Sequence, residues 1–146
     1  MKTRFVIEKE PTVVWPVTVE IPAGGQLEKH RFEATFRVLP EAAYAEIEAQ
    51  VATVLEKIAA SKGRMNELVA RNAELLPPLV VSWDGPQAED GTPVPVGDLP
   101  ALLTGPYGAP LAKGLSRAIN QIRLGVPAED VASAAEGNSA PSPAAG

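Results

Sequence analysis

Hydrophobic and polar residues alternate along the first part of the chain. Every odd position from 13 to 21 is apolar, and the same two-residue period returns in residues 31–38 after the turn-like sequence Pro22-Ala23-Gly24-Gly25. A period of two is typical of strands that bury one face. We therefore predict an antiparallel β-hairpin over residues 13–38. Pro16 cannot donate a ladder hydrogen bond, so the first strand should lie at a sheet edge or carry a bulge there.

The apolar spacing changes to three and four residues after Pro40. This period predicts an amphipathic helix over residues 41–61, and the Lys62-Gly63 pair is a typical helix end. A second helix is expected over residues 65–76, because the Pro77-Pro78 pair cannot continue it. A hairpin alone is only marginally stable in water. We expect the first of these helices to cover its apolar face.

The last part of the chain begins with a strand-like run at residues 79–83, which leads into a segment of prolines and Asp-Gly turn dipeptides. Such a segment has too little apolar content to be core, and Asp-Gly pairs are typical of turns. A short helix is expected over residues 98–103, with Asp98 able to cap it. A final amphipathic helix should run over residues 109–124 and stop at Gly125.

These patterns together predict an α+β fold, in which an N-terminal antiparallel hairpin or small sheet packs on a mostly helical body. One domain should span residues 1–125, β-rich over residues 1–39 and helical over residues 40–125. The β-rich part includes a short β-prone stretch at residues 4–8. Residues 126–146 consist mainly of Ala, Ser, Pro, Gly and Glu without apolar periodicity. We predict that they form a disordered tail.

Composition restricts the class of protein. The chain has 146 residues, a length at which folding can bury about 70% of the unfolded surface without a metal or a disulfide. It has no cysteine, which excludes disulfide scaffolds, thiol nucleophiles and cysteine-based zinc sites. A net charge of −5 argues against a nucleic-acid-binding surface. Neither a membrane helix nor a signal peptide is evident, so we expect an intracellular protein without a membrane partner.

Candidate catalytic and metal-binding residues are few. His30 is the only histidine, and its place in a polar strand fits a solvated residue better than a general base. The acidic residues of positions 84–98 resemble a cation site only loosely, because their spacing does not match an EF-hand and Asp-Gly pairs serve turns. Gly24-Gly25 lacks the lysine and hydroxyl residue of a phosphate loop. We therefore expect no enzyme, no catalytic residue, no metal site and no cofactor.

The roles of Trp15 and Trp83 have two interpretations each. Tryptophan is enriched both in partly buried packing sites and at protein interfaces, because its large ring carries one N–H donor. Core packing beneath the helices is one interpretation for each. An exposed role at the sheet edge is the alternative for Trp15, whereas Trp83 could anchor the stiff loop that follows it.

Three segments carry a resemblance to a known family: "FEATFRVL" in the hairpin, "LVVSWDGPQAEDGTPVPVGDLPALL" after the helical middle, and "AKGLSRAINQIRLG" in the last helix. Their order over about residues 12–125 is similar to that of the small tail assembly chaperones of long-tailed bacteriophages. The family combines a Trp-Asp-Gly, an acidic Asp-Gly turn, a Pro-Val-Pro and a leucine-rich short helix. The matching positions here are Trp83, Asp84, Gly85, Asp90, Gly91, Pro93, Val94, Pro95, Leu99, Leu102 and Leu103. Many members end the last helix with a lysine-asparagine pair after a glycine, whereas this chain has Gly125-Val126-Pro127.

The resemblance implies a non-enzymatic chaperone of tail morphogenesis in the cytoplasm of the infected bacterial host. Such proteins bind the tape measure protein, a long and largely helical chain, and recruit tail tube subunits around it. We expect the loop after Trp83 and the last helices to form the partner-binding surface. The candidate residues are Trp83, Asp84, Leu99, Leu102, Leu103, Leu111, Leu115 and Ile119.

Two other classes of protein stay open. A structural minor tail or tube-associated virion protein could use an unprotected hairpin edge to join a ring by strand addition. A bacterial binding module, such as an immunity or anti-defence protein, is favoured only by the acidic composition. Assembly into a homo-oligomer is compatible with each of these classes.

Overall fold

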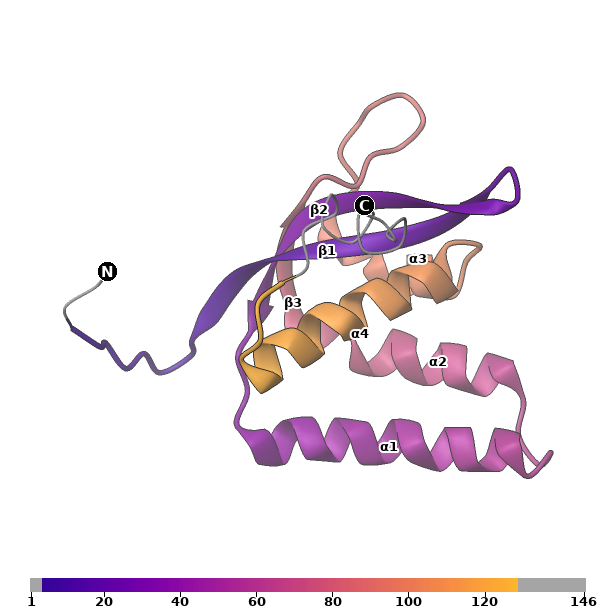
Figure 1. Ribbon diagram of the computed structural model, residues 1–146, viewed down its shortest axis with the longest axis horizontal. Helices are drawn as coiled ribbons and strands as arrows, with labels where there is room; N and C mark the ends of the chain where they lie inside the picture. The colour runs from indigo at the N-terminus through magenta and orange to yellow at the C-terminus, as the bar shows by residue number, and fades with distance from the viewer. Residues whose placement is uncertain (1–3, 129–146) are drawn as a thin grey trace, which may run out of the picture.

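The computed structural model describes residues 4–128 and shows an α+β fold with a sheet on one side and helices on the other (Figure 1). Within these residues the antiparallel sheet has three strands in the order β1-β2-β3. They are β1 (Thr12–Ala23), β2 (Gln26–Arg37) and β3 (Val80–Asp84). The predicted fold class and the N-terminal hairpin are confirmed.

The helices lie close to their predicted positions. They are α1 (Glu41–Ala59), α2 (Met65–Leu75), α3 (Leu99–Leu103) and α4 (Gly108–Leu124), with short 3-10 turns at η1 (Pro77–Leu79) and η2 (Val96–Asp98). Figure 1 shows α4 beside the hairpin and α1 on the opposite side of the molecule from it. Gly125 ends α4 with φ 68°, the left-handed conformation expected of a glycine stop.

The hairpin turn explains why β1 tolerates two prolines. Gly24 and Gly25 have φ values of 58° and 82°, as a two-residue type I′ turn requires. The residues that flank such a turn exchange hydrogen bonds, so every odd-numbered residue of β1 bonds to β2. Pro16 and Pro22 are even-numbered, and their missing N–H groups therefore face away from β2. The predicted edge position of Pro16 is confirmed, and the register between β1 and β2 contains no bulge.

The apolar face of the sheet is covered by α3 and α4 rather than by α1. The core joins this face to the last two helices and contains Val17, Val19, Ala34, Phe36, Leu76, Val80, Leu99, Leu103, Leu111, Ala112, Leu115 and Ala118. Burial of each large side chain of this kind contributes about 1.5–3 kcal/mol. The prediction that the helix after Pro40 covers the hairpin is wrong, because α1 packs chiefly on α2. An apolar stripe shows that a helix has a buried side but not which element covers it.

The sheet gains its third strand from the half of the chain predicted to be helical. β3 pairs with β2, and this pairing places Trp83 opposite Ala34 and Val80 opposite Phe36, with a bulge between them. The strand-like run at residues 79–83 is thus confirmed within one residue. The simple division into a β-rich and a helical half is wrong, because a local pattern does not reveal where a distant strand pairs.

Several local predictions differ from the structure. Residues 4–8 form no strand. α1 ends at Ala59, before the expected stop at Gly63. The left-handed residue that follows the helix is Ser61, with φ 60°, and not the glycine. Asp98 lies at the N-cap position of α3, but its side chain makes no capping hydrogen bond.

The predicted tail lies almost wholly outside the described residues, which end at residue 128. The division of the chain at residue 125 therefore stays a prediction. Across residues 4–128, none of the helices combines the length and the apolar character that crossing a membrane would require.

Close packing of α4 on β1 depends on Gly114. A Cβ atom at this position would lie 2.6 Å from the carbonyl oxygen of Thr18 and 3.3 Å from Cγ1 of Val17. Thr18 is even-numbered, so its carbonyl faces outward and α4 covers part of the outer edge of β1. Trp15 supports the same contact, since its Nε1 donates to Oε1 of Gln121 at 2.8 Å.

We expect Gly114→Ala to lower the free energy of unfolding by about 1–3 kcal/mol, the usual cost of overpacking. The change would otherwise gain about 1 kcal/mol of helix propensity, so a loss would show that the backbone contact dominates. Urea unfolding measures the difference. Gly97→Ala is the control, because a Cβ atom there meets nothing within 4 Å. Equal stability of the two variants would contradict the close approach.

Candidate functional site

Trp83 fastens the loop of residues 85–95 to the sheet. Its Nε1 donates a hydrogen bond to the carbonyl oxygen of Val94 at 2.7 Å. Its ring packs edge-on against Phe32, with ring centroids 5.7 Å apart. Gly85 follows with φ 144°, and a side chain there would collide with Cβ of Phe32. The Trp-Asp-Gly sequence thus has a physical basis, because the glycine passes close to the ring that the tryptophan contacts.

The loop itself folds back as a small antiparallel turn. The N–H of Ala88 donates to the carbonyl of Thr92 at 2.9 Å, and the N–H of Val94 donates to that of Pro86 at 3.0 Å. Oδ1 of Asp90 accepts from the N–H of Thr92 at 2.9 Å. Hydrogen bonds from the side chain and the backbone of Thr92 hold the pKa of Asp90 below its usual value. Asp90 therefore acts here as a turn residue.

The structure places the remaining acidic and basic candidates at the surface. Asp84 is exposed beside Trp83. His30 is exposed, and its Nε2 lies 2.6 Å from Oε1 of Glu28. Within residues 4–128, no three His, Asp or Glu side chains are grouped so that they could hold a metal ion.

The leucines of the predicted partner surface belong largely to the core. Leu99 and Leu115 are 0% exposed, Leu103 is 1% exposed and Leu111 is 7% exposed. A partner cannot reach these four side chains in this conformation, and the core accounts for their spacing. Leu102 and Ile119 are half-buried at the margin of the same cluster.

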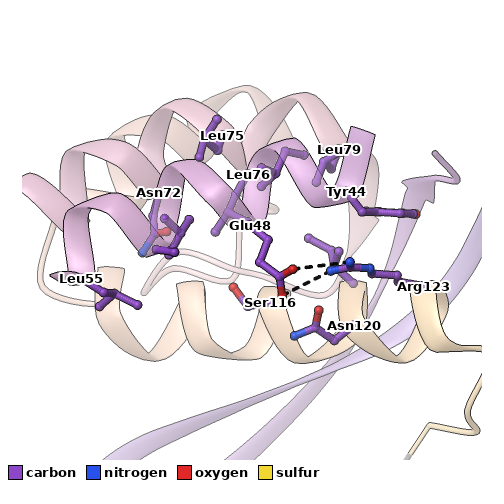
Figure 2. Close-up of a pocket in the computed structure, with 14 residues that line it drawn as sticks. Tyr44, Glu48, Leu55, Asn72, Leu75, Leu76, Leu79, Ser116, Asn120 and Arg123 are labelled. Atoms are coloured by element: carbon purple, nitrogen blue, oxygen red, sulfur yellow. Dashed lines mark hydrogen bonds and ion pairs between the residues drawn. The ribbon is translucent and has the colours of Figure 1, made fainter. Parts of the chain in front are cut away.

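An apolar groove runs between α1 and α4, with α2 at its floor (Figure 2). Its volume is about 320 Å³. The lining residues are Tyr44, Ile47, Glu48, Val51, Ala52, Leu55, Asn72, Leu75, Leu76, Leu79, Ser116, Ile119, Asn120 and Arg123. A neighbouring hollow of about 280 Å³ shares Val51, Leu55, Asn72 and Ser116 with it and extends to Met65. The two hollows therefore form one groove.

Part of the α4 wall carries small side chains. Ala109, Ala112 and Ser116 line the half of the groove that reaches Met65, whereas Ile119, Asn120 and Arg123 line the other half. On α1, only Tyr44 and Val54 are buried. The stripe of Ile47, Val51 and Leu55 is therefore covered only in part, and Leu55 is 46% exposed.

Arg123 of α4 bridges to α1 at one end of the groove. Its Nε donates to Oε1 of Glu41 at 2.9 Å, and its Nη1 lies 3.5 Å from Oε2 of Glu48. The guanidinium also lies 5.9 Å from the ring centroid of Tyr44, a cation–π contact. The hydrogen bond from Arg123 lowers the pKa of Glu41, and the same contact raises the pKa of Arg123. We call this group the Arg123 clasp.

Sequence reasoning missed both the groove and the clasp. Glu41 and Glu48 are seven residues apart on one helix, so the pattern places them on one face. Their common partner lies 82 and 75 residues away from them in sequence. Only folding brings these three side chains together.

Comparison of the chain with models of protein families, with curated protein sequences and with solved structures finds no match. The function is therefore argued from the residues and from the geometry of two surfaces. These are the Trp83 loop and the groove between α1 and α4.

Trp83→Phe should loosen the loop while leaving the sheet in place. Phenylalanine keeps the aromatic contact with Phe32 but loses the hydrogen bond to Val94, which costs about 1 kcal/mol. We expect faster amide hydrogen exchange in residues 86–95 and little change in α4. Ser82→Ala, an exposed change on the same strand, is the control. Unchanged loop protection in Trp83→Phe would show that the tryptophan does not hold the loop.

Arg123→Gln should release the N-terminal half of α1. We expect lower amide protection factors in residues 41–50 at pH 7 and unchanged protection in β1 and β2. Lys57→Gln removes one positive charge from an exposed position of α1 and should have no such effect.

Acid should reproduce this release in the unaltered protein. The folded-state pKa of Glu41 is lowered, so its ion pair with Arg123 stabilises the folded state fully at pH values above the ordinary carboxyl pKa. This stabilisation is lost as the pH falls through the lowered pKa of Glu41. Arg123→Gln should lack the Glu41-dependent step. An equal acid response in both proteins would rule out the clasp as its cause.

Proposed function

We propose that the protein is a non-enzymatic tail assembly chaperone of a long-tailed bacteriophage. In this role it binds the tape measure protein in the cytoplasm of the infected host and helps recruit tail tube subunits. The observation that carries the proposal is the open apolar groove bounded by three helices. The resemblance of the Trp-Asp-Gly loop to that family supplies the biological setting.

The groove supports a client-binding role on physical grounds. Contiguous apolar surface that remains accessible in a folded protein is typical of an interaction site. A long helical client has an apolar seam that stays in water until the tube forms around it. A protein that covers this seam with matching apolar side chains would prevent aggregation without any chemical step.

Recruitment of tube subunits would need a second surface, and the Trp83 loop supplies a suitable one. The loop is held by Trp83 and by its own backbone hydrogen bonds, so binding would order few additional residues. Its acidic residues stay exposed, with Asp84 at the base and Asp90 at the turn. A preorganised, exposed loop of this kind fits protein recognition better than catalysis.

The geometry of β1 weighs against strand addition at its outer edge, one route by which the alternative virion protein could assemble. Pro16 and Pro22 both face the outer edge and provide no donor for an added strand. α4 lies against the edge near Thr18, where Gly114 approaches the carbonyl. Glu20 is held there by Arg117, with Oε1 and Nη2 3.2 Å apart.

Co-expression with the tape measure protein of the same phage tests the proposal. We expect the tape measure protein to be mainly insoluble alone and severalfold more soluble with the chaperone, and the two proteins should co-purify. Mass spectrometry of purified virions should detect no stoichiometric amount of the chaperone. An unchanged solubility of the tape measure protein, together with stoichiometric presence in virions, would favour the structural alternative.

A further inference from the structure

We infer that the groove between α1 and α4 receives one amphipathic helix of the client. The apolar seam of that helix would lie along the groove, and lysine or arginine residues beside the seam would reach Glu41 and Glu48. The inference rests on the proposed function and names both the surface and the chemistry of the segment it binds.

The arrangement of the helices leaves one corner of a bundle empty. α1 packs on α2, and α2 contacts α4, whereas the groove separates α1 from α4 (Figure 2). In a four-helix bundle each helix packs against two neighbours, with about 8–10 Å between the helix axes. A helix seated over the groove would contact α1 and α4 and would direct its seam toward α2.

The spacing of the groove residues fits a helical occupant. Ile47, Val51 and Leu55 recur every four residues along α1 and span about 12 Å, the rise of roughly two helical turns. Apolar anchors at this spacing are typical of grooves that bind amphipathic helices. In the half of the groove that Val51 and Leu55 line with Met65, the α4 wall includes the small residues Ala109, Ala112 and Ser116, which leave room for large residues of the partner.

Charge at the clasp favours a basic flank on the occupant. Glu41 and Glu48 share the single cation of Arg123, so this end of the groove carries one surplus negative charge. Their side chains are 67% and 68% exposed, whereas Arg123 is 16% exposed, so a partner meets the carboxylates first. Lys113 at the other end lies 3.6 Å from Glu20 and shares that carboxylate with Arg117, so the surplus charge at that end is positive. Complementary charge of this kind sets orientation and excludes acidic segments.

Two synthetic helical peptides provide the probe. Both carry a leucine-isoleucine seam, flanked by lysine in one and by glutamate in the other, and a scrambled lysine peptide has the same composition without the seam. We expect the lysine-flanked peptide to bind the full chain at least about tenfold more tightly than the glutamate-flanked peptide. The scrambled peptide should not bind, because charge alone does not bury a seam.

A matched pair of variants locates the binding site. Leu55→Asp places a charge in the groove and should weaken binding of the lysine-flanked peptide by more than about tenfold. Ala49→Asp adds the same charge on the exposed side of α1 and should change the affinity less than about twofold. Val51→Thr, a milder change in the same groove, should also weaken binding. It tests the groove independently if Leu55→Asp does not fold. Circular dichroism confirms that each variant is folded.

The outcomes distinguish a failure of the groove assignment from a failure of the proposed chaperone function. Equal peptide binding by Leu55→Asp and Ala49→Asp would overturn the groove assignment, even if the tape measure protein still co-purifies. Peptide binding at the groove without any solubilisation of the tape measure protein would retain the groove and overturn the proposed function. A stable dimer in native mass spectrometry that Leu55→Asp dissolves would assign the groove to a second copy of the chain and overturn the client helix.

Discussion

The close approach of α4 to β1 sets how the other elements of the fold can pack. The sheet has one apolar face, and α4 lies against it because Gly114 places no side chain between the helix and the backbone of Thr18. Leu111 and Leu115 can then reach the core from the same helix. α3, whose Leu99 and Leu103 join that core, completes the cover. With the sheet covered in this way, α1 is not needed for the core.

The position of α1 follows from the flank of α4 that faces it. One face of α4 carries Leu111 and Leu115, which cover the sheet, and the flank beside that face carries the small residues Ala112 and Ser116 along half of its length. The apolar stripe of α1 is therefore covered only in part by α4, and the helix is held mainly by α2 and by the Arg123 clasp. Ion pairs with exposed carboxylates contribute little to stability, so this attachment is weaker than a packed core. A groove beside a weakly attached helix is well suited to open for a helical partner.

The candidate site was predictable only in part. Turn chemistry identified the Trp83 loop, because Asp-Gly pairs and prolines act locally and keep their meaning in any fold. The family resemblance and the amphipathic last helix assigned Leu99, Leu103, Leu111 and Leu115 to a partner surface, and they are core residues. Amphipathic spacing looks the same whether the covering surface is a sheet of the same chain or another protein. The groove is a space between helices that are not neighbours in sequence, so no local pattern describes it.

Local physical chemistry determined the elements of this protein from the sequence alone. Alternation produced the hairpin, the three-to-four spacing produced the helices, and Gly24, Gly25 and Gly125 ended them where a left-handed backbone was required. Long-range packing, in contrast, brings β3 beside β2, places α4 rather than α1 over the sheet, and brings Arg123 to Glu41. These choices depend on which complementary surfaces pack best across long separations, a property of the whole chain that no short segment contains.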